Sequence, residues 1–183
     1  SGVLSWPFSN AFMSSCMQRK NFFKNIFCIT QYFGNTPFST ANSQIYNNHG
    51  HNAIDIATPI GTPVLAALDG VVLETGDTDL ARNCYSFGKW IMVQHYNGLS
   101  TLYSHLSSID VAKSQKVSGS QVIGLSGMTG YATGPHLHFG VYATQGTQIM
   151  RLGEFRDGVK TGCAAAVMPV ATLTAYLNPL SYL

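Results

Sequence analysis

Charged side chains are scarce in this sequence of 183 residues, of which only 10% are Asp, Glu, Lys or Arg. Soluble domains usually contain about 25%. Ten Lys and Arg against eight Asp and Glu give a net charge of +2, and the basic residues form no cluster. Nucleic-acid binding therefore lacks its electrostatic signature. Apolar runs of the ~20 residues that a membrane span requires are also missing, so we expect no membrane-spanning segment in this chain.

No Cys-x-x-Cys pair is present, which argues against a structural zinc site rich in cysteine. The four cysteines, Cys16, Cys28, Cys84 and Cys163, are widely spaced. An even number suits disulfide bonds in an exported protein, whereas four buried thiols in a cytosolic protein are the alternative. The chain starts at Ser1 without the charged and apolar regions of a signal peptide, so we expect any export signal to have been removed or to lie outside it.

Long helical patterns are rare as well. The best candidates are 10–27 and 163–177, and Pro169 interrupts the second. Short alternating or β-branched runs, bounded by Gly and turn residues, are frequent instead. They read as strands and comprise CITQYFG, AIDIATP, TPVLAAL, GVVLETG, KWIMVQHY, LSTLYSHL, SQVIGLSG and HLHFGVYA. The pattern predicts a mostly β fold, a sandwich or barrel-like sheet.

The length suits one domain with a sizeable core, and we expect residues 1–183 to form a single domain. Internal repeats and low-complexity linkers are missing. Three stretches exceed the usual length of a hairpin connection, and we expect them to be loops added to the core. They are about 9–25, 75–88 and 144–175.

The segment TGPHLHFGV places His136 and His138 one residue apart. Because strand side chains alternate, Leu137, Phe139 and Val141 share one face, and the two imidazoles share the other, roughly 6–7 Å apart. Two imidazoles on one face suit a metal, or a metal and a proton-transfer group. A single histidine beside apolar residues is more often a hydrogen-bonded structural residue. The pair alone therefore leaves the role of each histidine open.

The segment NNHGHNAIDIATP supplies further candidates. A hydrolytic zinc site needs about three protein ligands and an open fourth position. His51 and Asp55 lie four residues apart, on one face of an extended segment. Asp55 stands between Ile54 and Ile56, and a buried carboxylate without a partner is costly, which favours a metal over a turn or capping role. His49 precedes Gly50, where we expect a turn, and it competes less well with His51 as a ligand.

The segment LSTLYSHLSSI contains another histidine. Thr101, Tyr103 and His105 alternate with Leu102 and other apolar positions, so we expect His105 to face away from the apolar core. His95 precedes an Asn-Gly turn, where a hydrogen-bonding role suffices, and we assign it no function.

The chain closely resembles the lysostaphin/LytM-type zinc metallopeptidases, which cut peptide bonds in bacterial peptidoglycan. Three motifs carry this resemblance, in this order along the chain: HNAIDIATPIGTPVLAALDGVV, LYSHLSSI and GMTGYATGPHLHFGV. The resemblance covers about two thirds of the chain, from residue 29 to Tyr142, and resumes at LNPLSYL. It implies an antiparallel β-sandwich or roll with little helix and an open substrate groove walled by long loops. The implied core comprises about 28–142 and a C-terminal return at 176–183.

Carried over residue by residue, the resemblance implies that His51, Asp55 and His138 bind one zinc ion. His105 and His136 match the two catalytic histidines that are not ligands. The division of roles within the His136/His138 pair, which alternation leaves open, follows only from this resemblance.

The sequence also departs from the family pattern. Ala53 stands where the family often has Gly, and Gly140 where it often has Glu. The three insertions have no counterpart that aligns. A tyrosine on the loop before the first ligand helps stabilise the oxyanion in some members, and Tyr46 is the nearest candidate here.

The expected chemistry follows from this ligand set. Two imidazoles and one carboxylate leave zinc with a net positive charge and an open position, where the pKa of water falls towards ~7. His136 would transfer the proton to the leaving amine, and His105 would orient the water or stabilise the tetrahedral intermediate. The expected protein is a monomeric zinc endopeptidase that cuts peptidoglycan stem or cross-bridge peptides outside the cytoplasm. The alternative is a non-hydrolytic cell-wall-binding or regulatory domain of the same fold.

The cysteines suit this extracytoplasmic setting. Cys16 and Cys28 bracket the first insertion, and Cys84 and Cys163 each lie inside another. The resemblance places the last two near the groove, at the ends of core strands. Of the three pairings that four cysteines allow, we therefore predict the one with the disulfides Cys16–Cys28 and Cys84–Cys163.

Overall fold

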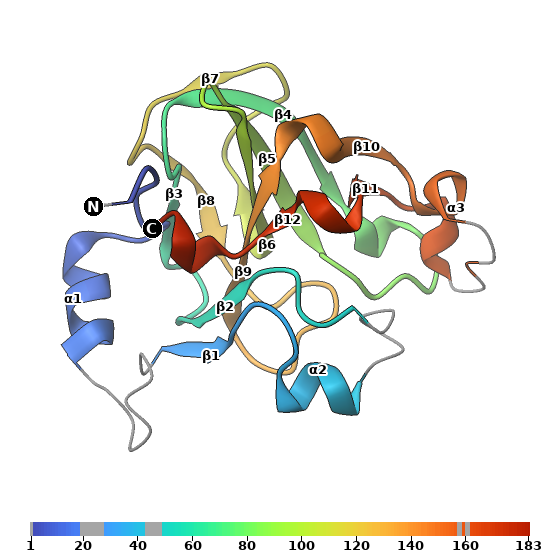
Figure 1. Ribbon diagram of the computed structural model, residues 1–183, viewed down its shortest axis with the longest axis horizontal. Helices are drawn as coiled ribbons and strands as arrows, with labels where there is room; N and C mark the ends of the chain where they lie inside the picture. Colours follow the sequence, from blue (N-terminus) through green and yellow to red (C-terminus); the bar gives the residue numbers. More distant parts are fainter. Residues whose placement is uncertain (1, 19–27, 43–48, 157–158, 160–161) are drawn as a thin grey trace.

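Figure 1 shows the computed structural model of the chain, in which the structure describes residues 2–18, 28–42, 49–156, 159 and 162–183. Its strands are β1 (Ile29–Gln31), β2 (Ile54–Ala57), β3 (Pro63–Leu65), β4 (Gly70–Asp77), β5 (Lys89–His95), β6 (Leu99–Ile109), β7 (Lys116–Val117), β8 (Val122–Ser126), β9 (His136–Ala143), β10 (Thr147–Arg151), β11 (Val167–Ala171) and β12 (Tyr176–Leu177). Its α-helices are α1 (Asn10–Gln18), α2 (Pro37–Ala41) and α3 (Leu152–Phe155). Short 3-10 helices occupy Thr78–Leu80, Thr144–Gly146, Gly162–Ala165, Leu173–Ala175 and Pro179–Ser181.

One antiparallel sheet contains ten of these strands, so the predicted mostly β class is confirmed. Its main path runs β1-β2-β9-β6-β5-β4-β7, while β12 adds to β9 and β8 connects β3 with β6. Strands β10 and β11 pair with each other in a separate hairpin. Every segment that reads as a strand from the sequence contains one. Among the described residues, no helix has the length and apolar character to traverse a bilayer.

Buried residues lie on both faces of the sheet. Along β9, Leu137, Phe139 and Val141 belong to the larger apolar cluster, whereas Tyr142 belongs to a second one. This confirms the alternation predicted for HLHFGV. The two histidines of β9 therefore stand on the face of the second cluster, which covers only part of the sheet.

Strand β9 lies inside the sheet, with β2 and β6 on its two sides. Asp55 of β2 pairs with His138, and Ser104 of β6 pairs with the same residue from the other side. Such cross-strand neighbours have Cβ atoms about 4.5–5.5 Å apart. The sheet register thus places the side chain of Asp55 next to that of His138, although the two residues are far apart in the sequence.

The N-terminal helix prediction, 10–27, is confirmed over Asn10–Gln18, and its remainder lies outside the described residues. The helix prediction at 163–177 is wrong. That segment contains strand β11, in which Pro169 pairs with Ile149 of β10. Both strands of a two-stranded hairpin are edges, where proline is tolerated because one side of the strand needs no N–H donor.

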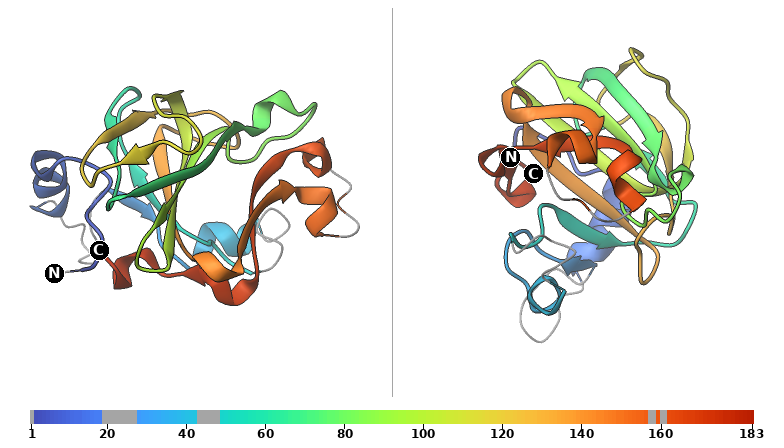
Figure 2. Two further views of the ribbon diagram at one scale, coloured as in Figure 1. Left: turned by 90° about the horizontal axis from the view of Figure 1, so that it is seen from above. Right: turned by 90° about the vertical axis from the view of Figure 1, so that its right-hand side faces the viewer.

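The insertions differ from the predicted loops. The described part of 144–175 contains the β10–β11 hairpin and α3, and the stretch 75–88 begins inside β4 and continues into a 3-10 turn. Figure 2 shows the hairpin projecting at the end of the molecule opposite to α1. The first insertion contains α1, and residues 19–25 lie outside the described part.

Both predicted disulfides are confirmed, Cys16–Cys28 and Cys84–Cys163. The second closes a loop with a sequence separation of 79 residues and joins the β4–β5 connection to the hairpin. Its two cysteines are buried in a third small apolar cluster, together with Met168 of β11. The bond therefore adds a covalent link to the hairpin, which also packs on the sheet through Ala171 in the second apolar cluster.

Removal of this second bond is expected to destabilise the protein. In the variant Cys84→Ala/Cys163→Ala, the free energy of unfolding should fall by about 2–5 kcal/mol, since the unfolded chain gains freedom and the small cluster loses its covalent link. Urea titration of the variant and the wild type measures the difference. Equal midpoints and slopes, or four alkylatable thiols in wild-type protein purified without reductant, would contradict this prediction.

Candidate metal centre and active site

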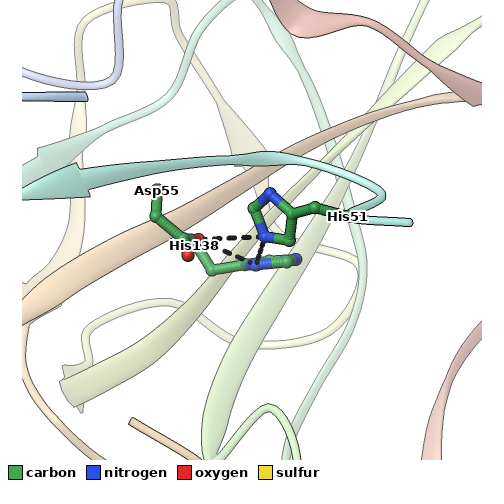
Figure 3. Close-up of side chains that lie close together, drawn as sticks. All are labelled: His51, Asp55 and His138. Atoms are coloured by element: carbon green, nitrogen blue, oxygen red, sulfur yellow. Dashed lines mark hydrogen bonds and ion pairs between the residues drawn. The ribbon is translucent and has the colours of Figure 1, made fainter. Parts of the chain in front are cut away.

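Three potential ligand atoms converge beside β2 and β9 (Figure 3). Nε2 of His51 lies 3.3 Å from Oδ1 of Asp55 and 3.2 Å from Nδ1 of His138. The remaining distance, from Nδ1 of His138 to Oδ1 of Asp55, is 3.1 Å. The two strand residues face each other in register, and His51 is placed by an isolated β-bridge to Gly34 just before β2. The predicted trio is thus brought together.

These separations suit a tetrahedral metal ion. Ligand bonds of about 2.0–2.1 Å at tetrahedral angles leave the ligand atoms roughly 3.3–3.4 Å apart. Nδ1 of His51 lies 3.1 Å from the carbonyl oxygen of Tyr32, so in the neutral ring Nδ1 donates and Nε2 carries the lone pair. A lone pair this close to a carboxylate oxygen is repulsive unless a cation lies between them. The donor set and its geometry therefore fit zinc.

The surroundings of Asp55 and His138 shift their pKa values towards the protonation states that metal binding needs. Burial alone would raise the pKa of Asp55, but the neighbouring imidazoles of His138 and His51 outweigh it and hold this pKa well below its usual range. Burial lowers the pKa of His138, despite the opposing effect of Asp55. An ionised carboxylate and a neutral imidazole are the forms that coordinate a metal.

His105 and His136 stand next to the trio, with their ring centroids 4.6 Å apart. Nδ1 of His105 lies 2.7 Å from the carbonyl oxygen of Thr129, and Nδ1 of His136 lies 2.8 Å from that of Gly134. In its neutral form, each ring therefore donates from Nδ1 and carries a lone pair on Nε2. Nε2 of His136 is 3.8 Å from Oδ1 of Asp55, which places it at the edge of the trio.

The environment keeps His105 neutral. Its burial, together with the neighbouring His138 and His136, lowers the pKa of His105 to about 3. A ring with this pKa accepts hydrogen bonds at Nε2 at neutral pH. Its chemical contribution is therefore that of an acceptor.

The alternation argument for His105 is wrong, although the ring does reach the site. Tyr103 points into the larger apolar cluster, so strict alternation would place His105 there too. Instead, the β5–β6 pairing contains an irregularity at this point, and His105 adopts a positive φ of 61°. This bulge turns the side chain to the face that carries His136 and His138.

A cavity of about 940 Å³ opens over the five residues, so the predicted groove is confirmed. One side is lined by the β4–β5 connection with Tyr85 and Phe87. Another side is lined by Phe155 of α3 and Pro169 of β11. His49 also lines the cavity but does not belong to the three-atom cluster. Tyr46, the candidate for oxyanion stabilisation, lies outside the described residues.

His95 is buried elsewhere, where Nδ1 contacts the carbonyl oxygen of Asp69 and Nε2 contacts the hydroxyl of Thr101. These contacts confirm the hydrogen-bonding role predicted for His95. Sequence reasoning missed the carbonyl groups of Thr129 and Gly134 that orient the catalytic candidates. Backbone carbonyls leave no residue-type signal, and only the motif GMTGYATG indicates where these turns are.

Comparison with known proteins identifies the family. The model of Peptidase family M23 matches residues 49–150, more than half of the chain. Peptidoglycan DD-endopeptidase ShyA of Vibrio cholerae is 53% identical over 89 residues, which are 49% of this chain and 19% of that protein. Glycyl-glycine endopeptidase ALE-1 of Staphylococcus capitis is 39% identical over 94 residues, 51% of this chain and 25% of that protein. The matched part thus spans a quarter or less of these two relatives.

Solved structures agree with this result. A zinc-containing peptidase from Vibrio cholerae superposes with a TM-score of 0.55 at 29% identity, over 79% of this chain and 37% of that one. The catalytic domain of lysostaphin from Staphylococcus simulans gives a TM-score of 0.60 at 24% identity, over 94% of this chain and 96% of the other, which shows the shared fold. The chain belongs to peptidase family M23.

Proposed function

We propose that this protein is a zinc-dependent endopeptidase that hydrolyses peptide bonds in peptidoglycan stem or cross-bridge peptides. The observation that carries the proposal is the cluster of His51 Nε2, Asp55 Oδ1 and His138 Nδ1 at mutual distances of 3.1–3.3 Å, open to a large cavity. Relatives that are named for peptidoglycan and glycyl-glycine endopeptidase activity support the choice of substrate.

In this proposal, His51, Asp55 and His138 hold one zinc ion. When bound, zinc supplies Lewis-acid polarisation of the scissile carbonyl and lowers the pKa of water. The three side chains are the only group of this kind that the described residues contain, and they offer no fourth protein ligand there. Such an open site is typical of catalytic rather than structural zinc.

The two remaining histidines perform the proton chemistry. His136 accepts a proton from the attacking water at Nε2, because its Nδ1 is engaged by the carbonyl of Gly134, and then donates that proton to the leaving amine. His105 orients the same water through its Nε2 lone pair. Both rings hold their tautomers through hydrogen bonds to backbone carbonyls, so they are oriented before substrate binds.

We further propose that residues 1–183 act as a single peptidase domain outside the cytoplasm, secreted, periplasmic or attached to the cell wall. Two disulfides support an oxidising compartment. Backbone hydrogen bonding between Leu4 N and Tyr182 O, 2.9 Å apart, supports the single domain because it joins the two ends of the chain. A monomer stays our prediction, which sedimentation of the purified protein tests.

Digestion of purified sacculi tests the proposed function. With one equivalent of zinc, the wild-type protein should release soluble muropeptides, and mass spectrometry of these fragments identifies the bond that is cut. Sacculi with direct stem-peptide cross-links and sacculi with oligoglycine bridges should be compared, because the named relatives act on different bonds. Chelation should abolish release, and zinc should restore it.

Binding to sacculi without release of fragments from either type would contradict the proposal. That result would instead favour the alternative, a wall-binding or regulatory domain of the same fold.

A further inference from the structure

The bulge beside His105 is held open by a residue from a different loop. At this point of the sheet, Lys89 of β5 pairs with Leu106 of β6, and the register then shifts before Ile91 and Tyr103. The hydroxyl of Thr129 bridges the two strands: it accepts a hydrogen bond from Lys89 N at 3.0 Å and donates one to Leu106 O at 2.8 Å. The side chain therefore satisfies two backbone groups at the bulge.

The same residue also fixes the imidazole. The carbonyl oxygen of Thr129 accepts the Nδ1–H of His105 at 2.7 Å, the shorter of the two carbonyl contacts made by the catalytic candidates. The backbone N–H of His105 donates to Phe87 O at 2.8 Å. The loop that contains Thr129 thus holds the ring of His105, and the loop that contains Phe87 holds its main chain. The φ of His105, 61°, lies in a region that few non-glycine residues occupy.

These two loops cross each other at close range. Gly88 and Gly130 both have positive φ, and a Cβ atom at Gly88 would collide with the Thr129 side chain. The N–H of Gly130 donates to the carboxylate of Asp79 at 3.0 Å, and this aspartate lies in the exposed β4–β5 connection. Asp79 therefore supports the turn that contains Thr129 from the solvent side.

We propose that Thr129 is a positioning residue for His105. Its hydroxyl stabilises the bulge that turns His105 into the cavity, and its carbonyl sets the tautomer that leaves the Nε2 lone pair facing the substrate. Asp79 contributes by fixing the Thr129–Gly130 turn. The catalytic part of this inference rests on the proposed hydrolytic function, whereas the orientation of the His105 ring does not.

The test compares Thr129→Val, which keeps the shape and removes the hydroxyl, with Thr129→Ser, which restores it. Thr129→Val should lower kcat about ten- to a hundredfold with little change in KM or zinc content, because small displacements of a catalytic group have effects of this size. Thr129→Ser should recover activity to within about threefold of wild type. The matched control is Thr147→Val, since the Thr147 hydroxyl also donates to a carbonyl, that of Ala143 at 2.9 Å, but lies outside the cavity lining.

A second readout does not depend on hydrolysis. In the wild-type protein, NMR of the imidazole N–H groups should show a slowly exchanging Nδ1–H signal from His105. Thr129→Val should shift this signal and speed its exchange, while the Nδ1–H signal of His136, bonded to Gly134, stays in place. Asp79→Ala should cause a smaller change of the same kind, and Asp79→Asn, which keeps an acceptor oxygen, should not.

Because Asp79 is exposed, its variants test the proposal even where Thr129→Val does not fold. Unchanged kcat and an unchanged His105 signal in folded Thr129→Val, or in Asp79→Ala, would overturn the inference. If the wild-type protein released nothing from sacculi but the variants showed the predicted NMR changes, the proposed function would be contradicted and the positioning role of Thr129 would stand.

Discussion

Replacing His138 by alanine is expected to reduce the zinc content of the purified protein from about one equivalent to near zero. The side chain supplies one of three ligand atoms, and its Nδ1 lies within 3.2 Å of both other atoms. Two protein ligands hold zinc far more weakly than three, and the loss leaves the buried carboxylate of Asp55 beside fewer partners. Atomic absorption after dialysis against a weak chelator measures the metal.

His49→Ala is the matched control for this experiment. That histidine lines the same cavity two residues from His51 but is not a member of the three-atom cluster. Its removal should leave the zinc content near one. Equal zinc in wild type and His138→Ala would reject the ligand assignment, and loss of zinc in His49→Ala would show that His49 supplies a ligand in place of His51.

Replacing His136 by alanine is expected to have the opposite pattern: zinc content near one and turnover reduced by two or more orders of magnitude. Removing a general acid–base group costs about 10²–10⁴-fold in rate. The effect should fall on kcat and kcat/KM alike, as expected for an interaction made in the transition state. Release of a labelled muropeptide, measured at several substrate concentrations, separates the two constants.

His105→Ala should resemble His136→Ala, because both rings offer an Nε2 lone pair and neither belongs to the cluster of ligand atoms. Folding is checked by circular dichroism and by the zinc content itself. If His136→Ala lost zinc while His138→Ala kept it, the roles of the two histidines in the HLH segment would be the reverse of those proposed.

Much of the metal centre could be predicted because it depends on periodicity. Asp55 and His138 belong to strands whose alternation is visible in IDIA and HLHF, and the sheet pairs them directly. His51 adds a ligand just before the first of these strands. Alternating polar and apolar residues report the face on which a side chain stands, so these positions carry their geometry in the sequence.

The position of His105 could not be derived in this way. A bulge breaks the two-residue period, and the groups that hold it are a hydroxyl and a carbonyl of Thr129, which is 24 residues away. The hairpin at 144–175 was missed for another reason. Its Ala-rich second half has helical propensity, and pairing with β10 overrides that local preference.

The β10–β11 hairpin forms one side of the cavity and packs in part on the ten-stranded sheet, where Ala171 and Ile149 join the second apolar cluster. It has its own small apolar cluster and is secured to the β4–β5 connection by the Cys84–Cys163 bond. Most of it also lies beyond residue 150, where the family match ends. All five histidine and aspartate residues of the site, in contrast, lie inside the matched segment 49–150. We therefore expect that exchanging this hairpin between family members would change which peptide bond is cut and would leave the catalytic histidines and the metal ligands unaltered.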